Sequence, residues 1–214
     1  SFFELKGTRN ISEKMSGFVE SYREYLEAVA SEPHDPERIF ALFDKFRILC
    51  ALRVGGWGVL RINTMLENIL SAKGLIRSDE PYYEGKPIMI SQNDYSLNLF
   101  NGDIGIALRD SLDNHKIKIC FRDKKEGVRK IIPDKLPVHE TVWAMTVHKS
   151  QGSEFDRIAL ILSDIDNPVL TRELVYTGIT RARHGAEIWS QTDILLNSVR
   201  KKIVRESGLA DALR

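Results

Sequence analysis

The sequence predicts an α/β protein, with a parallel sheet covered by helices on both faces and a small segment of antiparallel strands. Helix-like and strand-like patterns alternate after residue 137, which predicts the parallel sheet. The strand-like runs there are short and continuously apolar, as in strands buried on both faces. Residues 102–132 instead show short strands separated by turn residues, which predicts the antiparallel segment.

The chain before residue 86 is predicted to be mainly helical, after a possible first strand at Phe2–Leu5. Asn10 and Glu13 have the spacing of a capping box that opens a helix. Apolar side chains then recur every three or four residues, as on one buried helix face. They are Ile11, Met15, Phe18, Tyr22, Leu26 and Val29.

A second helix start is indicated at Asp35–Pro36, because Asp caps helices and Pro at the first position loses no needed hydrogen bond. Its apolar stripe is expected to run through Ile39, Phe43, Phe46 and Cys50. The glycines of Gly55–Gly58 interrupt this pattern. A third helix follows, with Ile62, Leu66 and Ile69 on its apolar face.

The pattern changes near residue 86. Pro87–Ile90 is a continuous apolar run of the kind found in buried parallel strands. The strands expected next are Ile104–Leu108, Ile117–Phe121 and Val128–Ile132, with turns at Asp113–Asn114 and Lys125–Gly127. We expect these strands to form a compact, antiparallel, barrel-like insert.

Beyond Pro137 the expected strands are Val142–Val147, Ile158–Leu162 and Ala186–Trp189. Thr171 is expected to cap a helix that runs to about Arg183, and a last helix is expected over Ile194–Val204.

Composition excludes several classes of protein. Of the 214 residues, 43% are hydrophobic and 29% charged, which is typical of a soluble globular chain. We find neither an apolar run of the roughly 20 residues that span a membrane nor a secretory-signal pattern at the start. Cys50 and Cys120 lie far apart, so we expect buried reduced thiols in a cytoplasmic protein. The net charge of +1 neither demands nor excludes nucleic acid.

A polar loop follows the expected strand Val142–Val147, at the carboxyl end where open α/β sheets bind ligands. Gly152 would let a backbone N–H approach a phosphate, and Glu154 could accept hydrogen bonds from ribose hydroxyls. Thr146 and His148 could donate to a nucleic-acid phosphate. The alternative is an ordinary connection without a ligand, since most loops are polar.

The helix expected after Thr171 has an apolar and a polar side. The polar side carries Thr177, Thr180, Arg181 and His184. An arginine on a rigid helix suits phosphate recognition, because its guanidinium can bind through two N–H groups and stays charged at any working pH. The alternative is an amphipathic helix with solvated arginines.

Together and in this order, the two segments carry a specific resemblance. TVHKSQGSEFD (146–156), followed by ELVYTGITRAR (173–183), resembles motifs V and VI of superfamily 1 helicases. EGKPIMISQNDYSLNLFNGDIGIAL (84–108), with ILCALRVGGWGV (48–59) before it, resembles the RecD family, the alpha subunits of exonuclease V. The resemblance covers nearly the whole chain.

The resemblance implies a fold and an activity. Such motors have two RecA-like domains with ATP bound between them, and this chain resembles the second one, over 1–100 and 139–214, with an SH3-like β domain inserted at 101–138. The implied parent is an ATP-dependent DNA helicase that translocates on single-stranded DNA in double-strand-break repair and recombination. ATP and Mg²⁺ are its implied cofactors, and RecB- and RecC-like subunits its implied partners.

The same resemblance assigns roles to individual residues. Arg181 matches the arginine that reaches the γ-phosphate, and Gly152 and Glu154 match positions near phosphate and ribose. The residues expected at the DNA are Thr146, His148, Asn93 and Asn101.

Three departures from the family pattern limit what the chain can do alone. It contains no GxxxxGK[ST], so nothing here would cradle the phosphates. Asp79–Glu80 does not follow a buried strand, so we expect no metal site, and Gln151 stands where many members have Lys. The chain alone is therefore not expected to hydrolyse ATP.

Two other classes remain open from the sequence. The chain could be a non-catalytic nucleic-acid-binding module, in which the β insert binds and the rest is scaffold. It could also be a subunit-docking domain, with Trp57 and Val59 beside the glycine-rich break as its interface.

Overall fold

The computed structural model describes residues 1–5, 9–123 and 127–202, with side chains in its first helix from Met15 onward. The first elements are β1 (Phe2–Glu4), α1 (Arg9–Ser21), α2 (Arg23–Ser31), α3 (Pro36–Phe43), β2 (Phe46–Cys50) and α4 (Val59–Ala72). The strands β3 (Pro87–Ile90), β4 (Ile104–Asp110), β5 (Lys116–Asp123), β6 (Gly127–Ile131) and β7 (His139–Thr141) follow. The last are β8 (Ala144–Thr146), β9 (Phe155–Ile161), α5 (Arg172–Ile179), β10 (Ala182–Ser190) and α6 (Thr192–Arg200).

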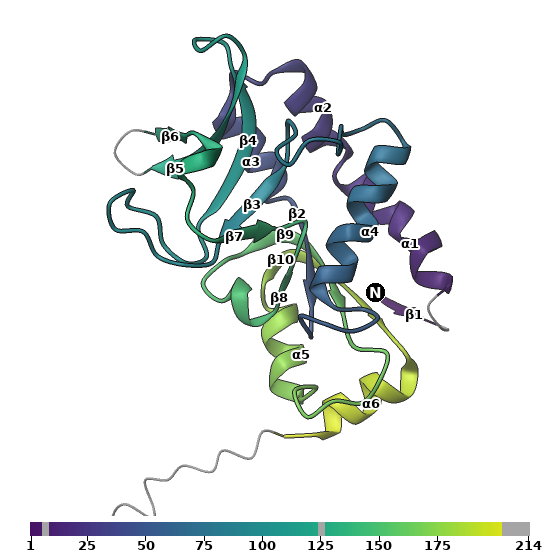
Figure 1. Ribbon diagram of the computed structural model, residues 1–214. Helices are drawn as coiled ribbons and strands as arrows, with labels where there is room; N and C mark the ends of the chain where they lie inside the picture. Colours follow the sequence, from purple (N-terminus) through teal and green to yellow (C-terminus); the bar gives the residue numbers. More distant parts are fainter. Residues whose placement is uncertain (6–8, 124–126, 203–214) are drawn as a thin grey trace, which may run out of the picture.

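One sheet is wholly parallel, in the order β1-β10-β9-β2-β8. Side chains alternate across it: Ile48 and Cys50 of β2 join the core formed with α1–α4, whereas Leu49 joins the core formed with α5 and α6. Figure 1 shows these two groups of helices on opposite sides of the strands. The predicted α/β fold, with helices on both faces of a parallel sheet, is confirmed.

A second sheet is antiparallel, in the order β6-β5-β4-β3-β7. The strands expected at Ile104, Ile117 and Val128 are confirmed as β4, β5 and β6. The expectation that Pro87–Ile90 forms a parallel strand is wrong, because β3 pairs antiparallel with β4 and β7. The division at residues 101 and 138, and closure into an SH3-like barrel, stay predictions.

The burial of β3 explains why its sequence resembles that of a parallel strand. Ile88 and Ile90 pack in the core of the antiparallel sheet, whereas Met89 packs in the core that the parallel sheet forms with α5 and α6. The strand is therefore buried on both faces and reads as a continuous apolar run, although its neighbours run antiparallel.

Two predicted helices end earlier than expected. Residues Phe46–Cys50 were expected to continue a helical stripe, but they form β2, a strand with every residue buried. The helix α5 ends at Ile179 rather than near Arg183, because Ala182 already pairs with Phe155 of β9. Arg181 thus lies just after the helix rather than on it, and the expectation of an arginine on the helix is corrected.

Several local expectations are confirmed. The Asp35 carboxylate accepts from Arg38 N at 3.1 Å, and the Thr171 hydroxyl accepts from Leu174 N at 3.3 Å, so both residues cap their helices. The apolar face from Met15 to Val29 is buried, although α1 and α2 divide it at Tyr22. The capping box at Asn10, the turn at Lys125 and the helix end at Val204 lie outside the described side chains.

The two cysteines are buried free thiols, and burial raises the pKa of Cys120 to about 11. Trp57 and Val59 are only 2% and 3% exposed, so they belong to the core and do not form the interface of the docking-domain alternative. Within the described residues, no helix is both long and apolar enough to cross a membrane.

Candidate functional site

The loop between β8 and β9 crosses the sheet, since β2 lies between these two strands. It leaves the carboxyl end of β8 at Thr146, passes through a 3₁₀ turn at His148–Ser150, and enters β9 at its amino end. Ser150 is fully buried, and its hydroxyl donates to Val147 O at 2.7 Å. The loop is therefore anchored at its centre and presents different residues at its two ends.

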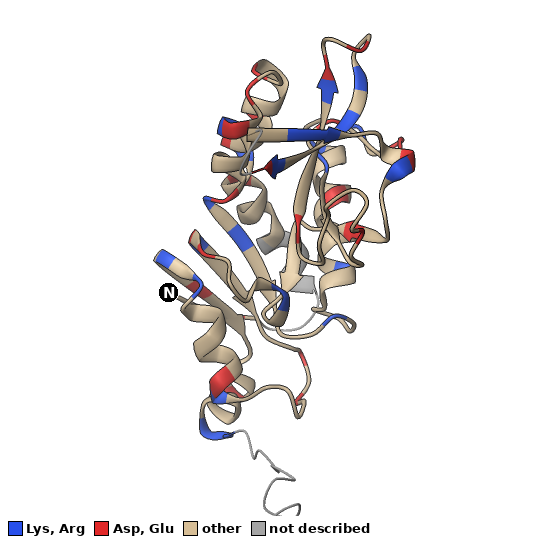
Figure 2. Ribbon diagram, turned by 90° about the vertical axis from the view of Figure 1, so that its left-hand side faces the viewer, with Lys and Arg blue, Asp and Glu red and all other residues tan. Residues whose placement is uncertain are grey.

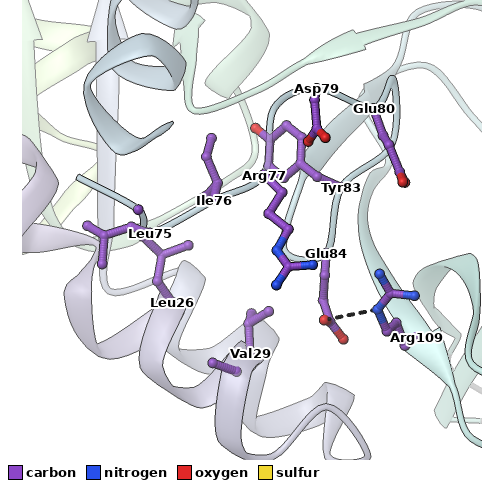
Figure 3. Close-up of a pocket in the computed structure, with 12 residues that line it drawn as sticks. Leu26, Val29, Leu75, Ile76, Arg77, Asp79, Glu80, Tyr83, Glu84 and Arg109 are labelled. Atoms are coloured by element: carbon purple, nitrogen blue, oxygen red, sulfur yellow. Dashed lines mark ion pairs between the residues drawn. The ribbon is translucent and has the colours of Figure 1, made fainter. Parts of the chain in front are cut away.

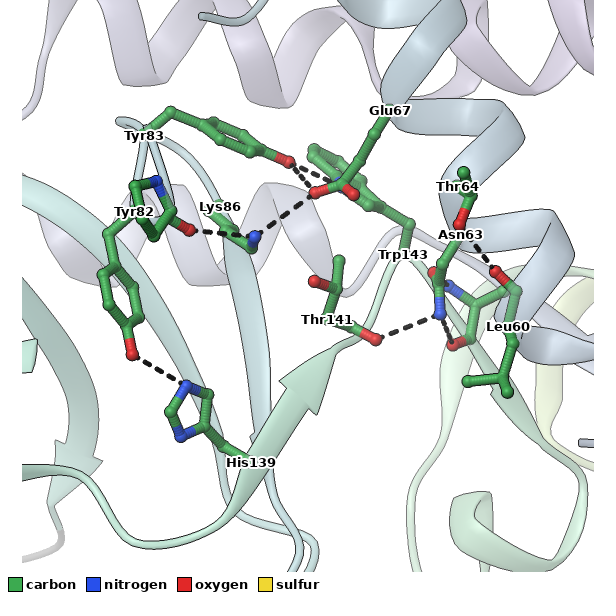
Figure 4. A network of polar contacts seen from close by, with 12 residues as sticks. Leu60, Asn63, Thr64, Glu67, Tyr82, Tyr83, Lys86, His139, Thr141 and Trp143 are labelled. Atoms are coloured by element: carbon green, nitrogen blue, oxygen red, sulfur yellow. Dashed lines mark hydrogen bonds and ion pairs between the residues drawn. The ribbon is translucent and has the colours of Figure 1, made fainter. Parts of the chain in front are cut away.

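A buried polar network fixes the chain where it enters β8 (Figure 4). The Asn63 amide of α4 donates to Thr141 O at 3.0 Å and to Ala144 O at 3.1 Å, and accepts from Ala144 N at 2.7 Å. Trp143 donates through Nε1 to the Tyr83 hydroxyl at 3.1 Å. With both backbone and side-chain groups satisfied, this segment is a rigid base for the loop.

Arg181 lies against the loop. Its Nη1 donates to Ser153 O at 3.3 Å and its Nε to Thr177 O at 3.2 Å, while its own carbonyl accepts from Phe155 N at 2.8 Å. The side chain is half-buried. Among the described residues, its Nη2 has no hydrogen-bond partner. The guanidinium is thus held in place with its Nη2 amino group left for a ligand.

Gly152 and Glu154 are the neighbours of Ser153, whose carbonyl accepts from Arg181. Gly152 has a φ of +83°, a conformation that favours glycine, and the space around its missing Cβ is open. Glu154 accepts from Arg183 Nε at 3.1 Å, with both side chains more than half exposed. An exposed pair of this kind contributes little stability, so Glu154 can exchange Arg183 for another partner. No sequence pattern indicated this pair.

Thr146 and His148 lie at the other end of the loop. The Thr146 hydroxyl accepts from Lys149 N at 3.3 Å, and His148 is exposed. His148 and Gln151 line a hollow of about 700 Å³ whose other wall includes Thr177 of α5.

The Lys149 side chain is not free at this point. Its Nζ lies 2.5 Å from Glu140, which also accepts from Arg53 at 2.6 Å. Burial alone would raise the pKa of Glu140, but the hydrogen bonds from Lys149 and Arg53 outweigh it and lower that pKa below its usual value. Glu140 therefore ties the loop to β7 and to the segment after β2.

Asn93 and Asn101 belong to the loop between β3 and β4. The Asn93 side-chain oxygen accepts from Asn101 N at 2.8 Å, and both residues are exposed. Gly102 and Asp103 of this loop line a second hollow, of about 360 Å³, together with Ser153–Phe155 and Arg183. The structure thus brings the Asn93 loop to the Glu154 end of the β8–β9 loop, not to the His148 end.

Arg47 is a site residue that the sequence analysis missed. It is fully buried in β2, with its guanidinium 3.7 Å from the Phe43 ring centre and 4.9 Å from that of Phe155. It donates to Val142 O at 3.1 Å and pairs with Asp44 at 3.4 Å, and burial lowers its pKa. The only signal was an arginine within an otherwise apolar strand.

Asp44 extends this contact to the antiparallel sheet, because it also pairs with Arg122 of β5 at 2.5 Å. Arg47 thus supports Phe155 beside the loop, and Asp44 joins both sheets. Basic and acidic residues are interspersed along the elements in Figure 2. Such a pattern fits local ion pairs of this kind.

A third hollow, of about 380 Å³, lies between α2 and the segment 74–84 (Figure 3). The acidic pair Asp79 and Glu80 lines it, and Glu84 at its wall pairs with Arg109 at 3.4 Å. None of its lining residues comes from the β8–β9 loop.

Comparisons with known proteins agree with the motif assignment. A family model described as UvrD-like helicase C-terminal domain matches residues 141–188, which contain the loop and Arg181. The RecBCD enzyme subunit RecD of Haemophilus influenzae is 34% identical over 95% of this chain and 32% of its own length. The ATP-dependent RecD2 DNA helicase of Deinococcus radiodurans is 27% identical over 78% of this chain and 23% of its own length.

Among solved structures, a Bacteroides Pif1 helicase in complex with ADP-AlF3 and ssDNA has a TM-score of 0.44 and 20% identity, covering 99% of this chain and 54% of that one. The RecD of Buchnera aphidicola from Acyrthosiphon pisum is 34% identical over 94% of this chain and 33% of its own length. The chain spans about a third of the length of these RecD relatives. Over nearly its whole length the chain is therefore similar to RecD subunits, and its residues 141–188 match the UvrD-like helicase C-terminal domain.

Proposed function

We propose that the chain is the second motor domain of an ATP-dependent superfamily 1 DNA helicase, and that Arg181 completes the ATP site from across a domain cleft. The observation that carries this proposal is the position of Arg181. Its guanidinium is tied to Ser153 and Thr177, beside Gly152 and Glu154, and its Nη2 amino group is unpaired among the described residues. A fixed, permanently charged donor is what a developing phosphoryl charge requires.

The groups in this chain fit only part of an ATP site. Gly152 offers an open backbone and Glu154 an exchangeable carboxylate, which suit a phosphate and a ribose. The sequence has no phosphate-cradling loop, so ATP phosphates and Mg²⁺ would be held by another domain of the parent. Mg²⁺ would neutralise phosphate charge there. An arginine supplied in this way is worth about 10³–10⁵ in rate.

The loop offers a route from nucleotide to DNA. Gly152 and Glu154 lie at one end, and Thr146 and His148 at the other, with Ser150 anchored between them. Closure on ATP would move both ends together because the buried centre resists bending. Contacts to backbone phosphates would give a sequence-independent grip on single-stranded DNA that weakens with salt.

The wider setting follows from the relatives. Because those relatives are named as subunits of the RecBCD enzyme, we extend to this chain RecB- and RecC-like partners. By the same reasoning, we propose that the full-length protein translocates on single-stranded DNA and unwinds duplex DNA in double-strand-break repair and recombination, in the cytoplasm. The residues 1–100 and 139–214 would form the motor domain, and 101–138 the SH3-like insert.

The experiment is Arg181→Ala in the full-length protein, with Arg172→Ala as the matched control. Arg172 lies at the start of α5, with its Nη2 4.0 Å from the Glu173 carboxylate. ATP turnover should fall by about 10³-fold or more in Arg181→Ala and stay near normal in the control, with DNA binding retained in both. Unchanged turnover in Arg181→Ala would remove this residue from the mechanism. Tight DNA binding without any ATP turnover in the wild type would favour a non-catalytic module.

A further inference from the structure

A buried arginine is an unusual side chain for a central strand. Arg47 is fully buried in β2, and its neighbours Phe46 and Ile48 are apolar and buried as well. Among the described residues, its Nε has no hydrogen-bond partner. Burying a charged group costs free energy that its contacts return only in part, so apolar side chains in such positions are often equally stable. The stability of the fold alone does not account for this arginine.

The Arg47 guanidinium contacts both flanks of the β8–β9 loop. Where the chain approaches the loop, Arg47 Nη1 donates to Val142 O at 3.1 Å, two residues before β8 begins. Where the chain leaves the loop, the guanidinium carbon lies 4.9 Å from the ring centre of Phe155, the first residue of β9. One side chain thus connects the entrance and the exit of the loop.

The segment that carries this guanidinium is itself tied to the start of β9. Asp156 N donates to Asp44 O at 3.3 Å, and Arg157 N donates to Lys45 O at 2.9 Å. Phe43, the last residue of α3, packs against the guanidinium with its ring centre 3.7 Å away. Because these contacts come from α3, β2 and β9 together, the guanidinium is held in one position between them.

The start of β9 is also where Arg181 is held. Phe155 N donates to Arg181 O at 2.8 Å, and Ser153 O accepts from Arg181 Nη1 at 3.3 Å. Residues 153–155 thus hold both the backbone and the side chain of Arg181. A shift of Phe155 would move these two contacts together, and the Arg181 guanidinium with them.

We propose that Arg47 is a positioning residue for Arg181, and that it holds the flanks of the β8–β9 loop so that the Arg181 guanidinium meets the transferring phosphoryl group. This inference rests on the proposed function, because it applies only if Arg181 contacts that group. Functional groups need to be held within about 0.5 Å of the productive geometry by neighbours that packing has locked. A misplacement of about 1 Å can cost roughly 10²-fold in rate.

The experiment compares Arg47→Met, Arg181→Ala and the double variant in the full-length protein. Methionine keeps apolar bulk but has no donor for Val142 O. Ile106→Val is the control for a small core change, because Ile106 is fully buried in β4 of the antiparallel sheet. The measurements are ATP turnover, affinity for ADP, and affinity for ADP plus aluminium fluoride, which mimics the phosphoryl group in transfer. They are made at a temperature at which thermal melting shows every variant to be folded.

Turnover should fall about 10²-fold in Arg47→Met and stay near normal in Ile106→Val. In Arg47→Met, affinity for ADP should stay within about twofold of the wild type, whereas affinity for the mimic should fall with turnover. The reason is that a displaced Arg181 matters only where phosphoryl charge develops. The double variant should lose no more than Arg181→Ala alone, since Arg47 acts through Arg181.

Asp44→Ala provides a comparison that separates positioning from stability. It removes the carboxylate that pairs with Arg47 but leaves the guanidinium its contacts with Val142 O and the two rings. Asp44→Ala should therefore melt at a lower temperature than Arg47→Met, because a buried charge loses its partner, and yet turn over ATP faster. If Arg47→Met melts below the assay temperature, Arg47→Lys replaces it with the same expected loss, because lysine keeps the charge but lacks the flat guanidinium.

Normal turnover in Arg47→Met, together with a loss in Arg181→Ala, would overturn the role of Arg47 and leave the proposed function intact. Losses that multiply in the double variant would do the same, and so would turnover that follows melting temperature across all the variants. Normal turnover in Arg181→Ala would instead remove the proposed function, and the role of Arg47 with it.

Discussion

Removing Asp44 is expected to destabilise the protein more than removing its buried partner, Arg47. The pair is asymmetric, because the Arg47 side chain is fully buried and that of Asp44 is 33% exposed. In Asp44→Ala the guanidinium keeps the hydrogen bond to Val142 O and the contact with Phe43, but its charge is uncompensated. In Arg47→Met the remaining carboxylate still has solvent and Arg122.

The expected magnitudes follow from this difference. Loss of one partner of a buried pair costs about 3–5 kcal/mol, and the Arg47–Asp44 distance of 3.4 Å places Asp44→Ala near the lower end. Arg47→Met leaves Val142 O without its donor, at about 1–3 kcal/mol. It also removes a buried Nε that has no partner, which offsets part of that loss. We therefore expect about 3 kcal/mol for Asp44→Ala and about 1 kcal/mol for Arg47→Met.

The assay is urea unfolding of the chain, followed by the fluorescence of its buried tryptophans. The double variant should be about as stable as Arg47→Met alone, because the uncompensated charge is then gone. At about 2–4 °C per kcal/mol for a protein of this size, the melting temperatures should differ by several degrees. Arg122→Ala serves as the control for the exposed half of the contact. Equal losses in the two single variants, or losses that add in the double variant, would show that the buried charge of Arg47 is not the source of the instability.

Three further outcomes are expected. His148→Ala should weaken single-strand binding more than ATP binding in the full-length protein, whereas equal losses would mean misfolding. Glu140→Gln should lower the free energy of unfolding at pH 7 by about 1–3 kcal/mol. It should also make the free energy of unfolding decrease less steeply as the pH falls. The folded-state pKa of Glu140 lies below its ordinary value of 4.5. The stability that ionised Glu140 contributes is therefore present above pH 4.5 and is lost as the pH falls through the lower folded-state value. A variant whose stability depends on pH in acid as the wild type does would contradict this. Thr171→Ala should cost about 1 kcal/mol through the lost cap of α5, measured by thermal melting against Thr171→Ser.

Local sequence signals predicted much of this fold because they act over a few residues. The caps at Asp35 and Thr171, and the strand–loop–strand order around Gly152, all depend on near neighbours. The error at Phe46–Cys50 arose because residues spaced by three or four also occur in a short strand that is buried throughout. Neither the short length of this run nor the arginine within it decided between a helix and a strand.

The contacts within the site could not be predicted, since they join distant parts of the chain. Arg183 meets Glu154, and Asp44 meets Arg122, only because β9 pairs with β10 and the two sheets pack together. The direction of β3 could not be predicted either. Burial on both faces indicates a central strand, but it does not indicate whether the neighbouring strands run parallel or antiparallel. The position of Arg181 after α5 depends likewise on the pairing of Ala182 with Phe155.

In the proposed mechanism, Arg181 contacts phosphoryl charge that develops only during ATP hydrolysis. The most direct measurement compares the affinity of the full-length Arg181→Ala protein for ADP with its affinity for ADP plus aluminium fluoride, a mimic of the transferring phosphoryl group. Affinity for ADP should stay within about twofold of the wild type, while affinity for the mimic should fall by about 10³-fold or more. An equal loss for both ligands, or no loss for either, would contradict the claim.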